Sequence, residues 1–225
     1  MILGIYGSGG LGREILDLVK VINAVAGQWE RVVFINDFKD EEFVNDTEVL
    51  PFVEFKTVFS PDNTRISIAI GEPKIRKNLR EKVEENGYKL QTLVHPTAFV
   101  GTNVLIGDGA IIQFGSFVSC DVILGTNALV QSYATIGHDS VIGNDAVIST
   151  FVAVSGACMI GDRTYIGINV PVREKAQIGA DTIVGMGSAV LRDIPNNVVV
   201  LGNPARVVRE NTSGYVFKQE GQGTC

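Results

Sequence analysis

From residue 94 onward, the hydrophobic positions of the chain repeat every sixth residue. Neither the 3.6-residue period of a helix nor the alternation of an ordinary strand produces this spacing. A second series, four residues after the first, holds only small or slim side chains from Ala98 to Ser188. The first series is entirely Val, Ile or Leu: Val94, Val100, Ile106, Ile112, Val118, Leu124, Val130, Ile136, Ile142, Ile148, Val154, Ile160, Ile166, Val172, Ile178, Val184 and Val190.

Six residues accommodate one short strand and one turn, so three units make one triangular coil. The pattern is the hexapeptide repeat typical of a left-handed parallel β-helix, and residues 94–191 are long enough for five or six coils. We expect the aliphatic series to fill the prism and the small series to lie near its corners. A glycine often follows the aliphatic residue, as Gly107 and Gly125 do, and we expect it to adopt unusual backbone angles there.

The first 90 residues have a different pattern. Residues 2–6, 31–37 and 65–71 read as buried strands, and residues 13–24 and 73–85 as helices, the second ending at Gly87. The order β-α-β-loop-β-α-β predicts a parallel sheet with crossover helices. The predicted fold class is therefore α/β plus β, a small Rossmann-like domain followed by a left-handed β-helix.

The first predicted strand runs into a glycine loop in which Gly7, Gly9 and Gly12 have G-x-G-x-x-G spacing. Such a loop lets the backbone approach a phosphate, and the helix after it presents free N–H groups. The domain is too short for the two mononucleotide halves of a dinucleotide fold, which disfavours an NAD oxidoreductase. A bound diphosphate and a simple tight turn both remain open. Asn36 and Asp37 end the second strand and either contact the nucleotide or form a solvated turn.

Composition excludes several classes of protein. The net charge of −6 disfavours a non-specific nucleic-acid binder, and 45% hydrophobic residues without an apolar run of membrane length predict a soluble, cytoplasmic protein. Cys120, Cys158 and Cys225 match neither a zinc motif nor a disulfide framework, and we expect reduced thiols without a catalytic role. A γ-class carbonic anhydrase, which shares this architecture, needs three histidine ligands, and the chain has only His95 and His138.

Several stretches together resemble the bacterial sugar O- and N-acyltransferases of the sialic-acid O-acetyltransferase type. They are "YGSGGLGREI", "VFINDFK", "IAIGEPKIRKNL", "IGHDSVIG", "IGINVPV" and "GNPARVV", and the resemblance covers residues 2–209. It is strongest to the N-acetyltransferases that act on nucleotide-linked 4-amino-4,6-dideoxyhexoses. The resemblance implies acetyl-CoA as co-substrate, no metal, and a homotrimer with its sites between subunits.

The resemblance also implies roles for individual residues. His138 corresponds to the family's catalytic base and Asp139 to the acid beside it. The repeat independently puts His138 at an outward-facing corner, two residues after the interior Ile136. The implied substrate-binding residues are Gly7, Ser8, Gly9, Gly10, Asn36, Asp37, Gly71 and Glu72, and the implied cofactor-binding residues are Val147, Gly167, Asn169, Gly202, Asn203, Pro204 and Arg206.

Two positions depart from the family pattern. Val147 stands where relatives often carry a second histidine that contacts the cofactor, and Glu72 stands where asparagine is common beside the sugar. These departures leave the mode of CoA binding and the particular sugar open.

We expect residues 1–92 to form the nucleotide-sugar-binding domain, residues 93–210 the acyltransferase β-helix and residues 211–225 a mobile polar tail. The leading functional prediction is an acetyl-CoA-dependent N-acetyltransferase acting on a nucleotide-linked amino sugar. A sugar O-acetyltransferase is the alternative, and a catalytically silent binding or assembly module is a third, from a different class.

Overall fold

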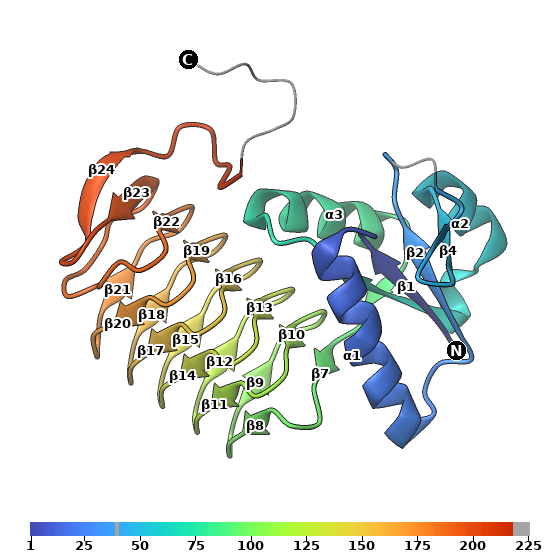
Figure 1. Cartoon of the computed structure of the whole chain (residues 1–225), viewed down its shortest axis with the longest axis horizontal. Coiled ribbons are helices and arrows are strands. Elements are labelled where there is room, and N and C mark those ends of the chain that lie inside the picture. The colour runs from blue at the N-terminus through green and yellow to red at the C-terminus, as the bar shows by residue number, and fades with distance from the viewer. Residues whose placement is uncertain (39–40, 218–225) are drawn as a thin grey trace.

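The computed structural model describes residues 1–38 and 41–217, and it contains a compact N-terminal domain joined to a parallel β-helix (Figure 1). The N-terminal domain has a six-stranded sheet in the order β3-β4-β2-β1-β5-β6. Its strands are β1 (Ile2–Tyr6), β2 (Arg31–Ile35), β3 (Phe43–Val44), β4 (Thr47–Leu50), β5 (Thr64–Ile68) and β6 (Lys89–Leu90). All neighbouring strands are parallel except β3 and β4, which form an antiparallel pair at the edge.

Helices cover both faces of this sheet. Helix α1 (Gly10–Ala26) buries Ile15, Leu16, Val19 and neighbouring apolar residues on one face. Helices α2 (Phe52–Val58) and α3 (Pro73–Glu85) pack on the other face, around Phe55, Ile66 and Val83. The predicted strands and helices are confirmed, with helix α1 starting three residues earlier than predicted. The stretch predicted as a loop contains β3, β4, α2 and a short 3₁₀ helix (Pro61–Asn63), because each is too short to show a hydrophobic period.

The β-helix is built from two-residue strands at six-residue intervals. Its domain-facing sheet contains β7 (Leu93–Val94), β10 (Ile111–Ile112), β13 (Leu129–Val130), β16 (Val147–Ile148), β19 (Tyr165–Ile166) and β22 (Ile183–Val184), and continues into β23 (Val198–Leu201) and β24 (Arg206–Glu210). The second sheet contains β8 (Phe99–Val100), β11 (Phe117–Val118), β14 (Thr135–Ile136), β17 (Ala153–Val154) and β20 (Pro171–Val172). The third contains β9 (Leu105–Ile106), β12 (Ile123–Leu124), β15 (Val141–Ile142), β18 (Met159–Ile160) and β21 (Gln177–Ile178).

These sheets give five complete coils, and β22 opens a sixth, as the repeat predicted. The interior consists of the two periodic series: Ile136, Ile148 and Ile166 are buried together with Ala134, Ala146 and Val170. The predicted fold class is confirmed.

The glycines that follow the aliphatic positions were expected to adopt unusual backbone angles, and this expectation is wrong. The left-handed backbone angles occur two residues later, at non-glycine positions such as Asn127 and Asp145. A Cβ at Gly107 would lie 2.5 Å from the amide nitrogen of Thr126 on the next coil. Glycine is therefore required at these corners by the close approach of successive coils.

The two domains share an apolar core. Leu93, Ile111, Leu129 and Val147 project from the domain-facing sheet into the same cluster as residues of α1 and the N-terminal sheet. In Figure 1 the N-terminal domain lies beside the first coils, with α3 extending along the prism. None of the helices in the described part of the chain is long and apolar enough to cross a membrane.

Candidate active site

His138 and Asp139 lie in the turn between β14 and β15, at the corner that joins the second and third sheets. The Nδ1 atom of His138 is 2.7 Å from Oδ2 of Asp139, and the two side chains are 62% and 61% exposed. Asp139 has a φ of +58°, the angle that turns the chain at this corner. A proton on Nδ1 shared with the carboxylate leaves a lone pair on Nε2.

Gly156 occupies the equivalent corner one coil later and leaves space for the imidazole. A Cβ on residue 156 would lie 2.6 Å from Nε2 of His138. Within the described part of the chain, the N–H of Gly156 donates no hydrogen bond, although its carbonyl accepts one from Lys175. A backbone donor thus lies beside the basic nitrogen of His138.

The glycine loop is built where sequence reasoning expected it, at the carboxyl ends of the parallel strands. Gly7 has a φ of +111°, and a Cβ at Gly12 would collide with the carbonyl of Gly7. Beta carbons at Gly9 and Gly10 would meet no atom within 4 Å, so the outer side of this turn is open. The side-chain amide of Asn36 donates to Ser8 Oγ at 2.8 Å and ties the loop to the end of β2.

Asp37, at the end of β2, accepts hydrogen bonds from three donors. Its Oδ2 accepts hydrogen bonds from Tyr6 Oη at 2.6 Å and Lys82 Nζ at 2.7 Å, and its Oδ1 accepts one from the Phe52 amide at 2.8 Å. Burial by itself raises the pKa of the Asp37 carboxyl, but these donors outweigh it and hold the pKa below its ordinary value. The same burial and the neighbouring carboxylate raise the pKa of Tyr6.

The remaining predicted residues lie in three places. Gly71 and Glu72 form the turn before α3, next to the glycine loop, and Glu72 is almost fully buried. Gly167 is buried and Asn169 is exposed, at the corner between the domain-facing and second sheets. Gly202, Asn203, Pro204 and Arg206 are exposed at the end of the prism.

Val147 requires a correction. It is 1% exposed and belongs to the apolar core between the domains, so it offers a cofactor no surface in this chain. The Val147 side chain points outward from the domain-facing sheet. It is buried because α1 and the N-terminal sheet cover that sheet. The hexapeptide pattern gives the direction of this side chain, but it does not say which sheet the other domain covers.

Within one chain, the glycine loop and His138 lie on different sides of the prism. The N-terminal domain packs against the domain-facing sheet, whereas His138 is at the corner opposite that sheet. The structure therefore does not bring the predicted acceptor-binding residues of a chain to the histidine of the same chain.

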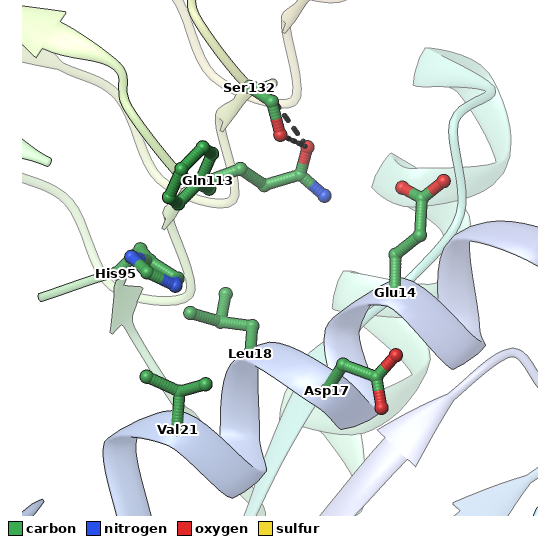
Figure 2. Close-up of a pocket in the computed structure, with 8 residues that line it drawn as sticks. Glu14, Asp17, Leu18, Val21, His95, Gln113 and Ser132 are labelled. Carbon is green, nitrogen blue, oxygen red and sulfur yellow. Dashed lines mark hydrogen bonds between the residues drawn. The ribbon is translucent and has the colours of Figure 1, made fainter. Parts of the chain in front are cut away.

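A separate cavity of about 210 Å³ lies between α1 and the corner that carries His95. Figure 2 shows Leu18 and Val21 of α1 on the side nearest His95, with Gln113 and Ser132 across the cavity from the helix; Glu14 and Asp17 of α1 also line it. The amide N–H of Thr97 donates to Nδ1 of His95, and burial lowers the pKa of this histidine. None of the predicted site residues lines this cavity.

Comparisons with known proteins agree with this architecture. Residues 3–83 match the family model of the PglD N-terminal domain. Over 112 residues, the chain is 32% identical to a GDP-perosamine N-acetyltransferase of Escherichia coli O157:H7, a match that covers 49% of this chain and 50% of that protein. The match thus spans about half the length of this curated relative.

Solved structures match over nearly the whole chain. The acetyltransferase domain of PglB from Neisseria gonorrhoeae has a TM-score of 0.87 at 28% identity, covering 92% of this chain and 99% of its own. PerB from Caulobacter crescentus, solved with CoA and GDP-perosamine, has a TM-score of 0.82 at 26% identity, covering 92% and 97%.

The fold and these matches define a hexapeptide-repeat protein that joins a PglD-type N-terminal domain to a parallel β-helix. The chain is similar to bacterial acetyltransferases of this architecture, among them a protein named as a GDP-perosamine N-acetyltransferase, in agreement with the resemblance that its motifs indicated.

Proposed function

We propose that this protein is an acetyl-CoA-dependent N-acetyltransferase that acts on the amino group of a nucleotide-linked amino sugar of the 4-amino-4,6-dideoxyhexose type. The observation that carries the proposal is the exposed His138–Asp139 pair beside the free amide of Gly156. The match of 92% of the chain to a protein solved with CoA and GDP-perosamine supports the substrate classes.

In the proposed reaction, the neutral amine of the sugar attacks the thioester carbonyl of acetyl-CoA. Nε2 of His138 removes the proton as the C–N bond forms, and Asp139 holds the imidazole in the required tautomer and stabilises its positive charge. Collapse of the tetrahedral intermediate breaks the C–S bond, and the imidazolium returns the proton to the departing thiolate. The products are the N-acetylated sugar and free CoA.

The backbone N–H of Gly156 is the proposed stabiliser of the oxyanion. It has no acceptor within the described residues and lies beside the basic nitrogen. Preorganised backbone donors of this kind lower the energy of the charge that develops on a carbonyl oxygen. Gly167, Asn169, Gly202, Asn203, Pro204 and Arg206 are the proposed CoA-binding residues.

The acceptor is proposed to come from a second copy of the chain. The nucleotide would lie on the open side of the glycine loop, with Asn36, Asp37, Gly71 and Glu72 nearby. Because the loop of one chain does not face its own His138, a homotrimer with sites between subunits would supply loop and base from different copies. We place the reaction in the cytoplasm, where acetyl-CoA is available.

A panel of GDP-, UDP- and dTDP-linked 4-amino sugars, assayed with acetyl-CoA for release of free thiol, tests the proposal. We expect acceptor-dependent thiol release with at least one member, and none with the matching 4-hydroxy sugar. If the hydroxy sugars or polymer-bound sugars react while the amino sugars do not, the protein is a sugar O-acetyltransferase. Binding of the sugars without any thiol release would indicate a silent binding module.

A further inference from the structure

The segment after β24 turns back from the β-helix toward the N-terminal domain. Asn211 is anchored on the β-helix, where its backbone N–H donates to Asn197 O and its side-chain amide donates to Asp181 O, both at 2.8 Å. Figure 1 shows the chain running from β24 to the neighbourhood of α3. We refer to Ser213–Phe217 as the strap. The rest of the predicted tail, residues 218–225, lies outside the described residues.

The strap is held mainly by two residues at the start of α3. Oε2 of Glu72 accepts hydrogen bonds from the amides of Val216 at 2.9 Å and Phe217 at 3.0 Å. Lys74 Nζ donates to Ser213 O at 3.0 Å and lies 4.4 Å from the ring centroid of Tyr215.

The strap also contacts the β-helix. The ring of Phe217 packs edge-on against Tyr165 of β19, with ring centroids 5.6 Å apart. The strap therefore bridges the two domains at the point where the N-terminal domain meets the prism.

Glu72 is a poorly satisfied residue in this arrangement. It is 4% exposed, and its second oxygen, Oε1, is buried without a hydrogen-bond partner among the described residues. Burial raises the pKa of its carboxyl, against the lowering effect of the Phe217 and Val216 amides and of the Lys74 charge. A buried polar atom without a partner is destabilising, so a hydrogen-bond donor that reached Oε1 would bind there favourably.

Glu72 lies at the edge of the sheet that carries the glycine loop. A Cβ at Gly7 would lie 2.8 Å from Ala69 O and from the Ile70 side chain, so the loop after β5 touches the loop after β1. Ligands of open parallel sheets bind at the carboxyl ends of the strands, where these loops meet. The strap thus covers a carboxylate at the position where the proposed acceptor would lie.

We propose that the strap is a displaceable cover that competes with the acceptor sugar for Glu72. With the strap displaced, both carboxylate oxygens of Glu72 accept hydrogen bonds from N–H or O–H groups of the sugar. With the strap docked, that position is closed. An acceptor then binds only if its binding free energy exceeds the free energy needed to displace the strap. This inference rests on the proposed function, since it requires a nucleotide-linked sugar at the glycine loop.

The test uses the full-length chain with Tyr215→Ala and Phe217→Ala together, which weakens the strap without changing Glu72. Val25→Ala, on the exposed end of α1, is the matched control, because Val25 is 80% exposed and outside every site described. Calorimetry measures the Kd of GDP-, UDP- and dTDP-linked 4-amino sugars and, separately, of acetyl-CoA. If the strap is docked about nine-tenths of the time, the double variant binds its sugar about tenfold more tightly than the control. The Kd of acetyl-CoA stays the same.

A further variant adds Glu72→Gln to the Tyr215→Ala, Phe217→Ala protein, so that the strap is already weakened when the charge of Glu72 is removed. We expect it to bind the sugar several-fold more weakly than the Tyr215→Ala, Phe217→Ala protein, because a carboxylate is the stronger acceptor. Equal or weaker sugar binding by the Tyr215→Ala, Phe217→Ala variant overturns the competition, and an unchanged Kd on adding Glu72→Gln to that variant overturns the role of Glu72. If no sugar nucleotide binds any of the proteins, the proposed function fails together with this inference.

Discussion

The imidazole of His138 lies against Gly156, which occupies the same corner one coil later, so closely that a Cβ at 156 would be 2.6 Å from Nε2. Glycine at this position lets the ring keep its 2.7 Å contact with Asp139 while it remains exposed to solvent. The orientation of the proposed base is therefore set by a residue eighteen positions away, through the stacking of coils.

Gly156→Ala is expected to turn the imidazole away from this position and break its contact with Asp139. The kcat of acetyl transfer should fall by about 10–100-fold, because a misplaced base loses the geometry of proton transfer. The midpoint of thermal unfolding should change little, since the His138 side chain is exposed and free to rotate. Steady-state thiol release and calorimetric unfolding measure the two effects. An unchanged kcat would show that the orientation of the imidazole is unimportant.

His138→Ala should lower kcat by about 10²–10⁴-fold while the acceptor and acetyl-CoA still bind, because the proton acceptor alone is lost. A variant at the other histidine, His95, is the control, because His95 lies at a different corner beside Phe114. His95→Ala should keep kcat within about twofold of the natural protein. Full activity of the His138→Ala protein would refute the assignment of the base.

A buried polar network fastens α3 to the β-helix and should contribute strongly to stability. Arg76, which is 0% exposed, donates to the carbonyl of Asn127 through Nε at 3.0 Å and through Nη2, which also reaches Asn127 Oδ1 at 2.8 Å. Arg80 pairs with Asp145 at 3.0 Å, and the Asp145 side chain is 1% exposed. Burial lowers the pKa of Arg76 to about 10, against the opposing charge of Asp145, so Arg76 stays charged at neutral pH.

Asp145→Ala should therefore destabilise the protein by about 3–5 kcal/mol, because it removes the buried carboxylate that pairs with Arg80, accepts from Asn127 Nδ2 and offsets the charge of the buried Arg76. Asp181→Ala is the matched control on the same corner, where the pair with Arg163 is half-exposed and should be worth no more than about 1 kcal/mol. Urea unfolding measures both variants. Equal losses would mean that burial of the first pair has no energetic consequence.

Asp37 should make stability depend on pH. Because its pKa is lower in the folded protein, its contribution is fully present above the unfolded pKa of about 3.9 and is lost as pH falls through the folded pKa. At pH 7, the natural protein should be more stable than Asp37→Asn by about 1–3 kcal/mol, and this difference should shrink below about pH 4. Urea unfolding at pH 7, 5 and 3.5 measures it. A difference that is constant with pH would contradict the assigned hydrogen bonds.

Much of the fold could be predicted because its signals are local and periodic. The interior positions from Val94 to Val190 were predicted by counting, and the β-α-β order gave the N-terminal sheet. The helix α2 and the edge strands were missed, since elements of two to seven residues carry no readable period. The corner position of His138 followed from the repeat, whereas its contact with Gly156 required the stacking distance between coils.

The sequence by itself determined the two architectures and the corner that carries the proposed base. A six-residue period assigns each residue of the repeat to the interior of the prism, to a corner or to its outer surface. The tertiary structure alone decided which sheet the N-terminal domain covers. That choice buries Val147, sets the glycine loop apart from the same chain's His138, and brings the strap onto Glu72. These contacts depend on how two domains and a terminal segment pack, and no local pattern of residues specifies such packing.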